Sequence, residues 1–345
     1  MSEIDDRLQR FCRERGVEGV VIRRRSNAAW ATGGADFHID AGSDLGIATL
    51  VWEPGRKRCF TTNIEAPRLR DEEPLDGWEI VEEPWWEPRG EVEKLLAAGR
   101  HASDFPDDPL YELRAELTPA QIEQARALGR DTARVVGRLM REDVKPGMTE
   151  HHLGGAAAGW LRDAGIRANV VLVASDERIA RYRHPVPSAK VIERVAMLAV
   201  CAQRHGLTVS VTRLAHFGPI PDDLRRRHEA VCSVEAALYG ATRPGAEWRE
   251  ALAAGVRAYE AAGFGDEWRL HHQGGPMGYL ARDFVATPSE RRPVRADQLV
   301  GWNPSITGTK GEDTILTRAE GEPELITPDD DWPSGPHGRR AILER

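Results

Sequence analysis

Two segments of the sequence carry the histidines best suited to proton transfer. His184 stands between Arg183 and Pro185, whereas His271 and His272 are adjacent and shortly precede a pair of glycines. An imidazole with a pKa near neutrality can both donate and accept a proton at pH 7. We therefore expect His184 to act as a general acid and base; the alternative is a loop histidine that hydrogen-bonds the backbone.

The two adjacent histidines are expected to differ in role. Neighbouring residues of a strand point to opposite faces, so only one of the two can face a given pocket. We assign the functional role to His271 and a structural role to His272. The glycines that follow, Gly274 and Gly275, permit close backbone approach, either to a substrate or to a neighbouring strand.

Glu312 is an acidic residue beside a predicted buried strand, and two roles are open to it. It could anchor a cationic substrate nitrogen or orient a water molecule, or it could form an ion pair with Arg213 or Lys310. Arg213 and Arg282 could each hold a substrate carboxylate through two hydrogen bonds. The alternative for each arginine is an ion pair that serves only the structure.

Apolar strands are expected in the central part of the chain. Residues 169–174 and 195–202 are apolar runs, and in residues 207–213 apolar side chains alternate with threonine and serine. Alternation with a period of two is typical of a strand, and residues 203–206 can form a hairpin turn. Later strands are expected at 298–302 and 313–317.

Helix signals place a domain boundary just before Thr118. Thr118 can cap a helix, Pro119 suits the first helical position, and Gln121 can close a capping box. We predict a smaller α/β domain over 1–116, a larger domain over 117–327 and a C-terminal tail over 328–345. Helices are expected at 119–141, 149–164, 222–241 and 247–262. Helices packed on an antiparallel sheet make the larger domain an α+β fold.

The composition of the 345 residues is that of a globular chain, with a net charge of −8. No apolar run is long enough to span a membrane, and the charged first residues are unlike a signal peptide. The four cysteines are isolated, which indicates neither a zinc motif nor a disulfide scaffold and fits a reduced, cytoplasmic setting. Arginine clusters at 23–25 and 225–227 lie beside acidic residues, so we expect neither nucleic acid nor a membrane as partner.

Eight segments follow one another in the order of motifs of the creatinase/Xaa-Pro aminopeptidase family, whose larger domain has the pita-bread fold. They are LTPAQIEQARALGRDTA, KPGMTEHHL, NVVLVASDERIARYRHP, GLTVSVTR, TRPGAEW, LHHQGGPMGY, WNPSITG and KGEDTILT. Together they cover about residues 117–327, which therefore resemble that domain. The segment SNAAWATGG resembles a turn of the creatinase-type N-terminal domain. The resemblance places His184 and His271 on the substrate side of the site.

The resemblance also implies a site for two metal ions, held by two aspartates, a histidine and two glutamates, a set suited to Mn, Co or Zn. Only Glu312 remains as such a ligand. The other four positions fall on Ala199, Ser210, Gly275 and Asn303. We therefore expect no bound metal and no other cofactor. Ser210 and Asn303 are either neutral fillers of the former metal cavity or groups that hydrogen-bond a substrate.

Creatinase is the family's precedent for chemistry without metal. We therefore expect a metal-independent hydrolase that cleaves a C–N bond in a small polar substrate, such as an amidine, an amide or a modified amino acid. The alternatives are a non-catalytic binding or scaffold protein descended from the family, and a metal-assisted Xaa-Pro peptidase. A different metal site would need His184, His205, His271 and Glu312 to converge, and HHQGG has no recognised ligand spacing. The family resemblance also implies a homodimer.

Overall fold

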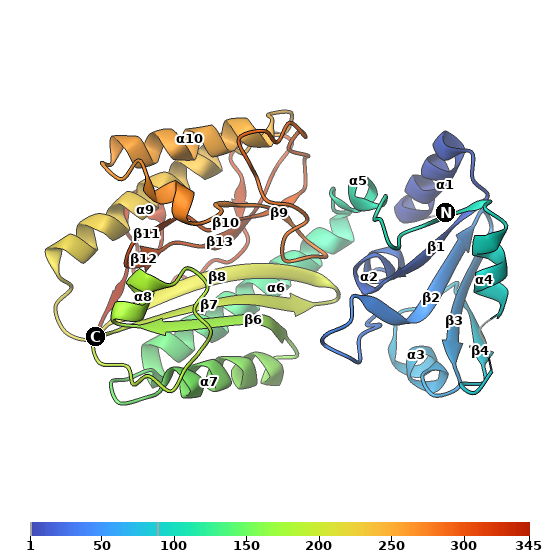
Figure 1. Cartoon of the computed structure of the whole chain (residues 1–345), viewed down its shortest axis with the longest axis horizontal. Helices are drawn as coiled ribbons and strands as arrows, with labels where there is room; N and C mark the ends of the chain where they lie inside the picture. Colours follow the sequence, from blue (N-terminus) through green and yellow to red (C-terminus); the bar gives the residue numbers. More distant parts are fainter. Residues whose placement is uncertain (1, 88–89) are drawn as a thin grey trace. The chain divides into compact units, whose positions relative to one another are not determined.

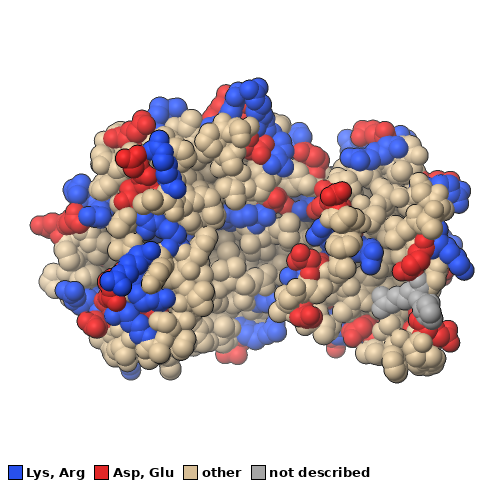
Figure 2. Space-filling model, in the orientation of Figure 1, with Lys and Arg blue, Asp and Glu red and all other residues tan. Residues whose placement is uncertain are grey.

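The computed structural model describes residues 2–87 and 90–345. The chain divides between Thr118 and Pro119 into two compact units, whose elements are labelled in Figure 1. On the face seen in Figure 2, Lys and Arg side chains are interspersed with Asp and Glu side chains. None of the helices in the described residues has the length and apolar character that crossing a membrane requires.

The first unit is built on a five-stranded sheet. Its strands are β1 Gly19–Arg24, β2 Leu45–Glu53, β3 Arg56–Thr62, β4 Glu79–Glu83 and β5 His101–Ser103, in the order β4–β3–β2–β1–β5. β2 is antiparallel to β1 and β3, whereas the edge strands β4 and β5 are parallel to their neighbours. The helices are α1 Glu3–Arg15, α2 Arg25–Thr32, α3 Ala66–Glu72, α4 Gly90–Ala97 and α5 Tyr111–Arg114. The α/β character predicted for this part of the chain is confirmed.

The second unit contains two four-stranded sheets and a short strand pair. One sheet has the order β15–β8–β7–β6 and consists of β6 Arg167–Ser175, β7 Val195–Arg204, β8 Leu207–His216 and β15 Leu343–Glu344. The other has the order β14–β13–β10–β9 and consists of β9 Gly274–Met277, β10 Leu299–Trp302, β13 Asp313–Leu316 and β14 Glu324–Leu325. The pair is β11 Ser305–Ile306 and β12 Thr309–Lys310.

Helices cover both sheets of the second unit. They are α6 Pro119–Arg138, α7 Glu150–Asp163, α8 Glu177–Arg181, α9 Asp222–Ala241 and α10 Trp248–Ala261, with shorter helical turns at Leu139–Asp143, Glu267–Leu270 and Pro336–Gly338. α6 and α7 pack on the sheet of β6, β7 and β8, whereas α9 packs on α10, β10 and the strand pair (Figure 1). This arrangement of helices on largely antiparallel sheets confirms the predicted α+β fold.

The α6 helix forms because its apolar residues recur at helical spacing. The residues of its buried face include Ile122, Ala125, Gly129, Ala133 and Val136. The helix predicted over 119–141 ends as an α-helix at Arg138, and Leu139–Asp143 continues it as a wider π turn.

The β7–β8 hairpin is unusual because both faces of β8 are buried. The predicted alternation puts Thr208, Ser210 and Thr212 on one face, and these polar side chains are buried rather than solvated. The Ser210 backbone N–H donates to the Thr314 hydroxyl at 2.7 Å, and that hydroxyl donates to the Ser210 carbonyl at 3.0 Å. The polar face of the hairpin therefore points toward the second sheet.

Residues 328–345, which the sequence sets apart as a tail, are part of the second compact unit. Trp332 and Ile342 are buried, and β15 pairs in parallel with β8. The Trp332 indole donates a hydrogen bond to the carbonyl of Ala341 at 2.8 Å. The end of the chain therefore completes one of the two sheets.

The substitution Gly129→Ala is expected to destabilise the second unit by about 1–3 kcal/mol, the usual cost of overpacking. A β-carbon at this position of α6 would overlap the carbonyl oxygen of Ile326. The matched control is Gly155→Ala in α7, where a β-carbon meets nothing and a better helix former gains up to about 1 kcal/mol. Urea unfolding measures both variants, and equal shifts would contradict the close packing at Gly129.

Candidate active site

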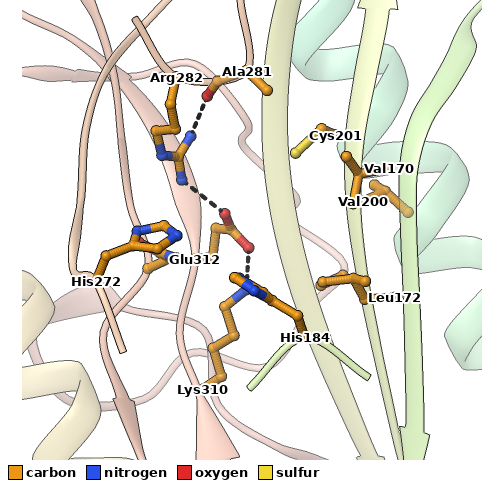
Figure 3. Close-up of a pocket in the computed structure, with 12 residues that line it drawn as sticks. Val170, Leu172, His184, Val200, Cys201, His272, Ala281, Arg282, Lys310 and Glu312 are labelled. Carbon is orange, nitrogen blue, oxygen red and sulfur yellow. Dashed lines mark hydrogen bonds and ion pairs between the residues drawn. The ribbon is translucent and has the colours of Figure 1, made fainter. Parts of the chain in front are cut away.

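A cavity of about 270 Å³ lies in the second unit, and residues from distant parts of the sequence line it. Val170, Leu172, Ala199, Val200 and Cys201 come from β6 and β7. His184, His272, Ala281, Arg282, Asn303, Lys310 and Glu312 come from loops and from β12. The cavity therefore has an apolar wall on one side and ionisable groups on the other, as Figure 3 shows.

Glu312 is buried at the centre of an ion cluster, which consists of Glu312, Lys310 and Arg282. Its carboxylate accepts hydrogen bonds from Lys310 Nζ at 2.7 Å, from Arg282 at 3.2 Å and from the Thr212 hydroxyl at 2.7 Å. Burial alone would raise the pKa of Glu312, but the positive charges of Lys310 and Arg282 lower it to about 2. The carboxylate is therefore ionised at neutral pH, and both of its oxygens accept hydrogen bonds.

The ion pair considered for Glu312 is present in the structure. Its partner is Lys310, and Arg282 joins the pair from the other side (Figure 3). Two cations already surround this one anion, so it is not a site for a third cation. The ion cluster therefore carries an excess of positive charge toward the cavity.

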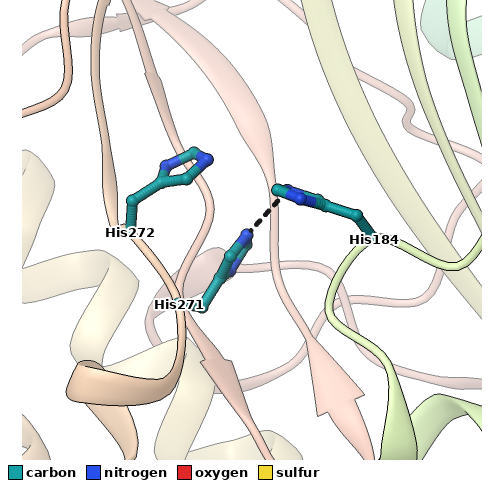
Figure 4. A group of neighbouring side chains, drawn as sticks. All are labelled: His184, His271 and His272. Atoms are coloured by element: carbon teal, nitrogen blue, oxygen red, sulfur yellow. Dashed lines mark hydrogen bonds between the residues drawn. The ribbon is translucent and has the colours of Figure 1, made fainter.

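Three histidines, His184, His271 and His272, form a second group, which we call the histidine group (Figure 4). The Nε2 atoms of His184 and His271 are 3.0 Å apart, and the three ring centroids lie 4.6, 4.9 and 5.6 Å from one another. Burial, and then the charge of Lys310, lowers the pKa of His271 to about 2 and holds the pKa of His184 below its ordinary value. Burial, and then the charge of Arg282, lowers the pKa of His272 to about 4. The three imidazoles are therefore neutral at pH 7.

The structure differs from the sequence-based prediction in which of the two adjacent histidines lines the cavity. His271 and His272 precede β9, which begins at Gly274, so the alternation of a strand does not apply to them. Both rings pack against His184, and His272 rather than His271 lines the cavity. His271 lies buried beside them, with 7% of its surface exposed.

An ion pair connects the two segments that carry the histidine group. Arg183, next to His184, pairs with Glu267 at 3.0 Å, and Glu267 begins the helical turn that ends just before His271. Glu267 also accepts hydrogen bonds from the backbone and the hydroxyl of Thr307, at 2.9 and 3.0 Å. These contacts hold together two histidines that are 87 residues apart in the sequence.

Glu150 fixes the loop that carries His184, and the sequence analysis missed this role. Its fully buried carboxylate, at the start of α7, accepts hydrogen bonds from the backbone and hydroxyl groups of Ser175 and Ser188. Arg178 forms an ion pair with the same carboxylate. The one signal in the sequence is the position of this glutamate in KPGMTEHHL, at the predicted helix start.

The residues expected to bind substrate lie in different surroundings. Asn303 lines the cavity, and its buried Oδ1 has no hydrogen-bond partner among the described residues. Ser210 is buried outside the lining, with its hydroxyl 3.3 Å from the sulfur of Cys201. Arg213 is buried and pairs with Asp313 at 3.0 Å, which is the structural alternative considered for it. Of the predicted set, the structure gathers His184, His271, Arg282, Asn303 and Glu312 around the cavity.

The two sheets of the second unit, flanked by helices around one cavity, have the pita-bread fold, and the α/β unit precedes it as in two-domain relatives. The chain belongs to metallopeptidase family M24, whose family model matches residues 123–319. No curated protein sequence matches the chain.

Solved structures with similar folds include two peptidases and one subunit of a larger complex. The chain is similar to the prolidase from Pyrococcus horikoshii, with 16% identity, a TM-score of 0.76 and coverage of 95% of this chain and 99% of that chain. For the X-Pro aminopeptidase from Thermotoga maritima, the identity is 17%, the TM-score 0.74 and the coverage 99% of each chain. For the N-terminal domain of the FACT complex subunit SPT16 from chickpea, the identity is 13% and the TM-score 0.66. The match covers 94% of this chain and 96% of that chain. These similarities show a common fold.

The residues at the expected ligand positions do not fit the family's pair of metal ions. Ala199 and Ser210 have no carboxylate, and Asn303 offers only a neutral amide. At Gly275 even a β-carbon would lie 2.5 Å from the carbonyl oxygen of Phe284, so the backbone leaves no room for a histidine. The one remaining carboxylate belongs to the ion cluster, where protonated side chains surround it.

We expect Mn²⁺ neither to bind tightly nor to activate the cleavage of Xaa-Pro dipeptides. Mn²⁺ prefers oxygen ligands, and the carboxylate of Glu312 is already paired with Lys310 and Arg282. Elemental analysis after equilibrium dialysis measures the bound ion, with a metal-activated prolidase as the positive control. Two retained Mn²⁺ ions per chain would contradict this interpretation of the site.

Glu150→Ala is expected to lower the free energy of unfolding by about 3–5 kcal/mol, because it removes one partner of a buried ion pair. The charge of Arg178 and the donors of Ser175 and Ser188 lose their acceptor. The matched control is Glu142→Ala, whose exposed pair with Arg138 is screened by water and contributes little to stability. Chemical denaturation measures both, and a Glu150 variant as stable as the control would show that the loop is held by other contacts.

Proposed function

We propose that this chain is a hydrolase that cleaves a C–N bond in a small substrate without the two-metal centre of its family. One observation carries the proposal: neutral histidines and an ion cluster with excess positive charge line the same cavity. The similar structures support the type of bond, since they are those of a prolidase and an X-Pro aminopeptidase.

The charge of the cavity favours a substrate that carries a carboxylate. Lys310 and Arg282 outnumber Glu312, and the histidines are neutral, so an anionic group is stabilised there. An N-acylated amino acid or a dipeptide therefore suits the site better than a cationic amidine. The apolar wall of Val170 and Leu172 can bury an uncharged part of the substrate, and the volume of about 270 Å³ limits its size.

The histidine group is the part of the cavity that can activate the attacking water. A neutral imidazole can take up a proton as water attacks the carbonyl carbon and can pass that proton to the leaving nitrogen. His184 is the most accessible member of the group and lines the cavity. The ammonium group of Lys310 can stabilise negative charge on the carbonyl oxygen, and the unpartnered Oδ1 of Asn303 can accept a hydrogen bond from a substrate N–H.

His184→Ala is expected to reduce kcat by a factor on the order of 10²–10⁴, the usual contribution of a positioned acid or base. Mass spectrometry of a panel of N-acylated amino acids and dipeptides first identifies a substrate. His152→Ala, at an exposed histidine of α7, is the matched control and is expected to keep full activity. Full activity of the His184 variant on that substrate would refute the proposed role.

Arg282→Gln is expected to raise KM for a substrate with a free carboxylate by about ten- to a hundredfold, since a hydrogen bond between charged groups is lost. The same variant should have little effect on KM for the amidated form of that substrate. Steady-state kinetics on the two forms separates recognition of the carboxylate from general damage to the ion cluster. An equal rise in KM for both forms would exclude carboxylate recognition by Arg282.

A second candidate function is that of a non-catalytic protein that binds a ligand in the same cavity. It is favoured by the replacement of four expected ligand residues and by the similar fold of the FACT subunit domain. Calorimetry with the panel of carboxylates tests it. A ligand that binds in the cavity and is not turned over would support this candidate over the hydrolase.

A further inference from the structure

We propose that His184, His271 and His272 together bind a single divalent transition-metal ion, with Zn²⁺ as the representative ion. The candidate ligand nitrogens of the three side chains all lie within 4.8 Å of one another. Figure 4 shows the three rings converging from two separate segments of the chain. None of the three residues occupies a ligand position of the family's two-metal centre, so this is a different site.

The spacing of the nitrogens is close to what one ion requires. With Zn–N bonds of about 2.0–2.1 Å, two imidazole nitrogens on a tetrahedral ion lie about 3.3 Å apart. The Nε2 atoms of His184 and His271 are 3.0 Å apart, so this pair needs little change. The remaining distances, at most 4.8 Å, require a rotation of the His272 ring toward the other two.

The hydrogen bonding of the histidine group is incomplete without a ligand. The Nδ1 atoms of His271 and His272 are buried and have no hydrogen-bond partner in the part of the chain that the structure describes. A buried polar atom without a partner is unfavourable because it has lost its hydrogen bonds to water. The contact between His184 and His271 pairs one nitrogen of each ring. An ion would accept one lone pair from each of the three rings.

The chemistry of the ligands selects the kind of ion. Three neutral imidazoles with no carboxylate suit Zn²⁺ and its neighbours in the transition series, whereas Mg²⁺, Ca²⁺ and Mn²⁺ prefer oxygen ligands. Because His184 and His272 line the cavity, the fourth position of such an ion can face the substrate. The positive charges of Lys310 and Arg282 oppose a bare cation but favour one that carries a hydroxide.

The bound ion would be the means by which the histidine group activates water in the proposed hydrolase. The role of the ion in hydrolysis therefore rests on the proposed function, whereas its binding does not. Binding itself is measured without substrate. The two proposals can therefore fail separately. If the chain binds no Zn²⁺ and its hydrolysis persists in the presence of a chelator, the proposed hydrolase function stands and the metal site is excluded.

Titration calorimetry with Zn²⁺ is the test, supported by the visible absorption of Co²⁺ as a reporter of tetrahedral nitrogen ligands. We expect one ion per chain. Each of the variants His184→Ala, His271→Ala and His272→Ala should weaken binding by about a hundredfold or more, since loss of a supporting residue alone costs up to about a hundredfold. His152→Ala, at an exposed histidine outside the group, should bind Zn²⁺ like the unmodified chain.

A measurement on the unmodified chain covers the case in which a variant does not fold. In protein with ¹⁵N-labelled histidine, saturating Zn²⁺ should shift the ring resonances of three of the 11 histidines. The inference is overturned if no Zn²⁺ binds, if all three folded variants bind it normally, or if fewer than three histidine rings respond. If Zn²⁺ binds to the histidine group but the chain hydrolyses none of the substrates, the metal site is supported and the proposed function is refuted.

Discussion

The candidate site depends on one buried interaction, the pairing of Glu312 with Lys310 and Arg282. Charged groups are stable away from water only when each finds an opposite charge and further hydrogen bonds, and the Thr212 hydroxyl completes this set. The interaction connects β8, β12 and the loop at residue 282. It also sets the electrostatics of the cavity, because its positive charges add to burial in keeping His184 and its neighbours neutral.

The groups suited to chemistry are carried by loops, and ion pairs at the base of those loops hold them in place. Glu150 anchors both sides of the loop of His184, and the pair of Arg183 with Glu267 joins that loop to the segment of His271. A rigid scaffold with functional loops is the usual arrangement of a binding site. Here the rigidity of the site comes from buried charge as well as from the sheets.

This chain has the fold of its family but different residues at the expected metal-ligand positions. Similar structures with TM-scores of 0.76 and 0.74 share only 16% and 17% sequence identity with it, so the architecture is retained although most residues differ. Function is decided by particular side chains within that architecture. Here the positions at which the family resemblance implies metal ligands hold Ala199, Ser210, Gly275 and Asn303, and an ammonium and a guanidinium surround the one remaining carboxylate, that of Glu312.

The amino-acid sequence by itself predicted the main helices and strands of the larger domain and the family, and it placed residues without a carboxylate or an imidazole at four expected metal-ligand positions. α6 and the β7–β8 hairpin follow from periodic burial, which is a local pattern. The sequence left open which charged residues pair with Glu312 and Arg213, and it assigned the pocket to His271 although His272 lines it. Only the tertiary structure decided these points, since the partner of a charge and the direction of a loop depend on residues far apart in the sequence, as in the pair of Arg213 and Asp313.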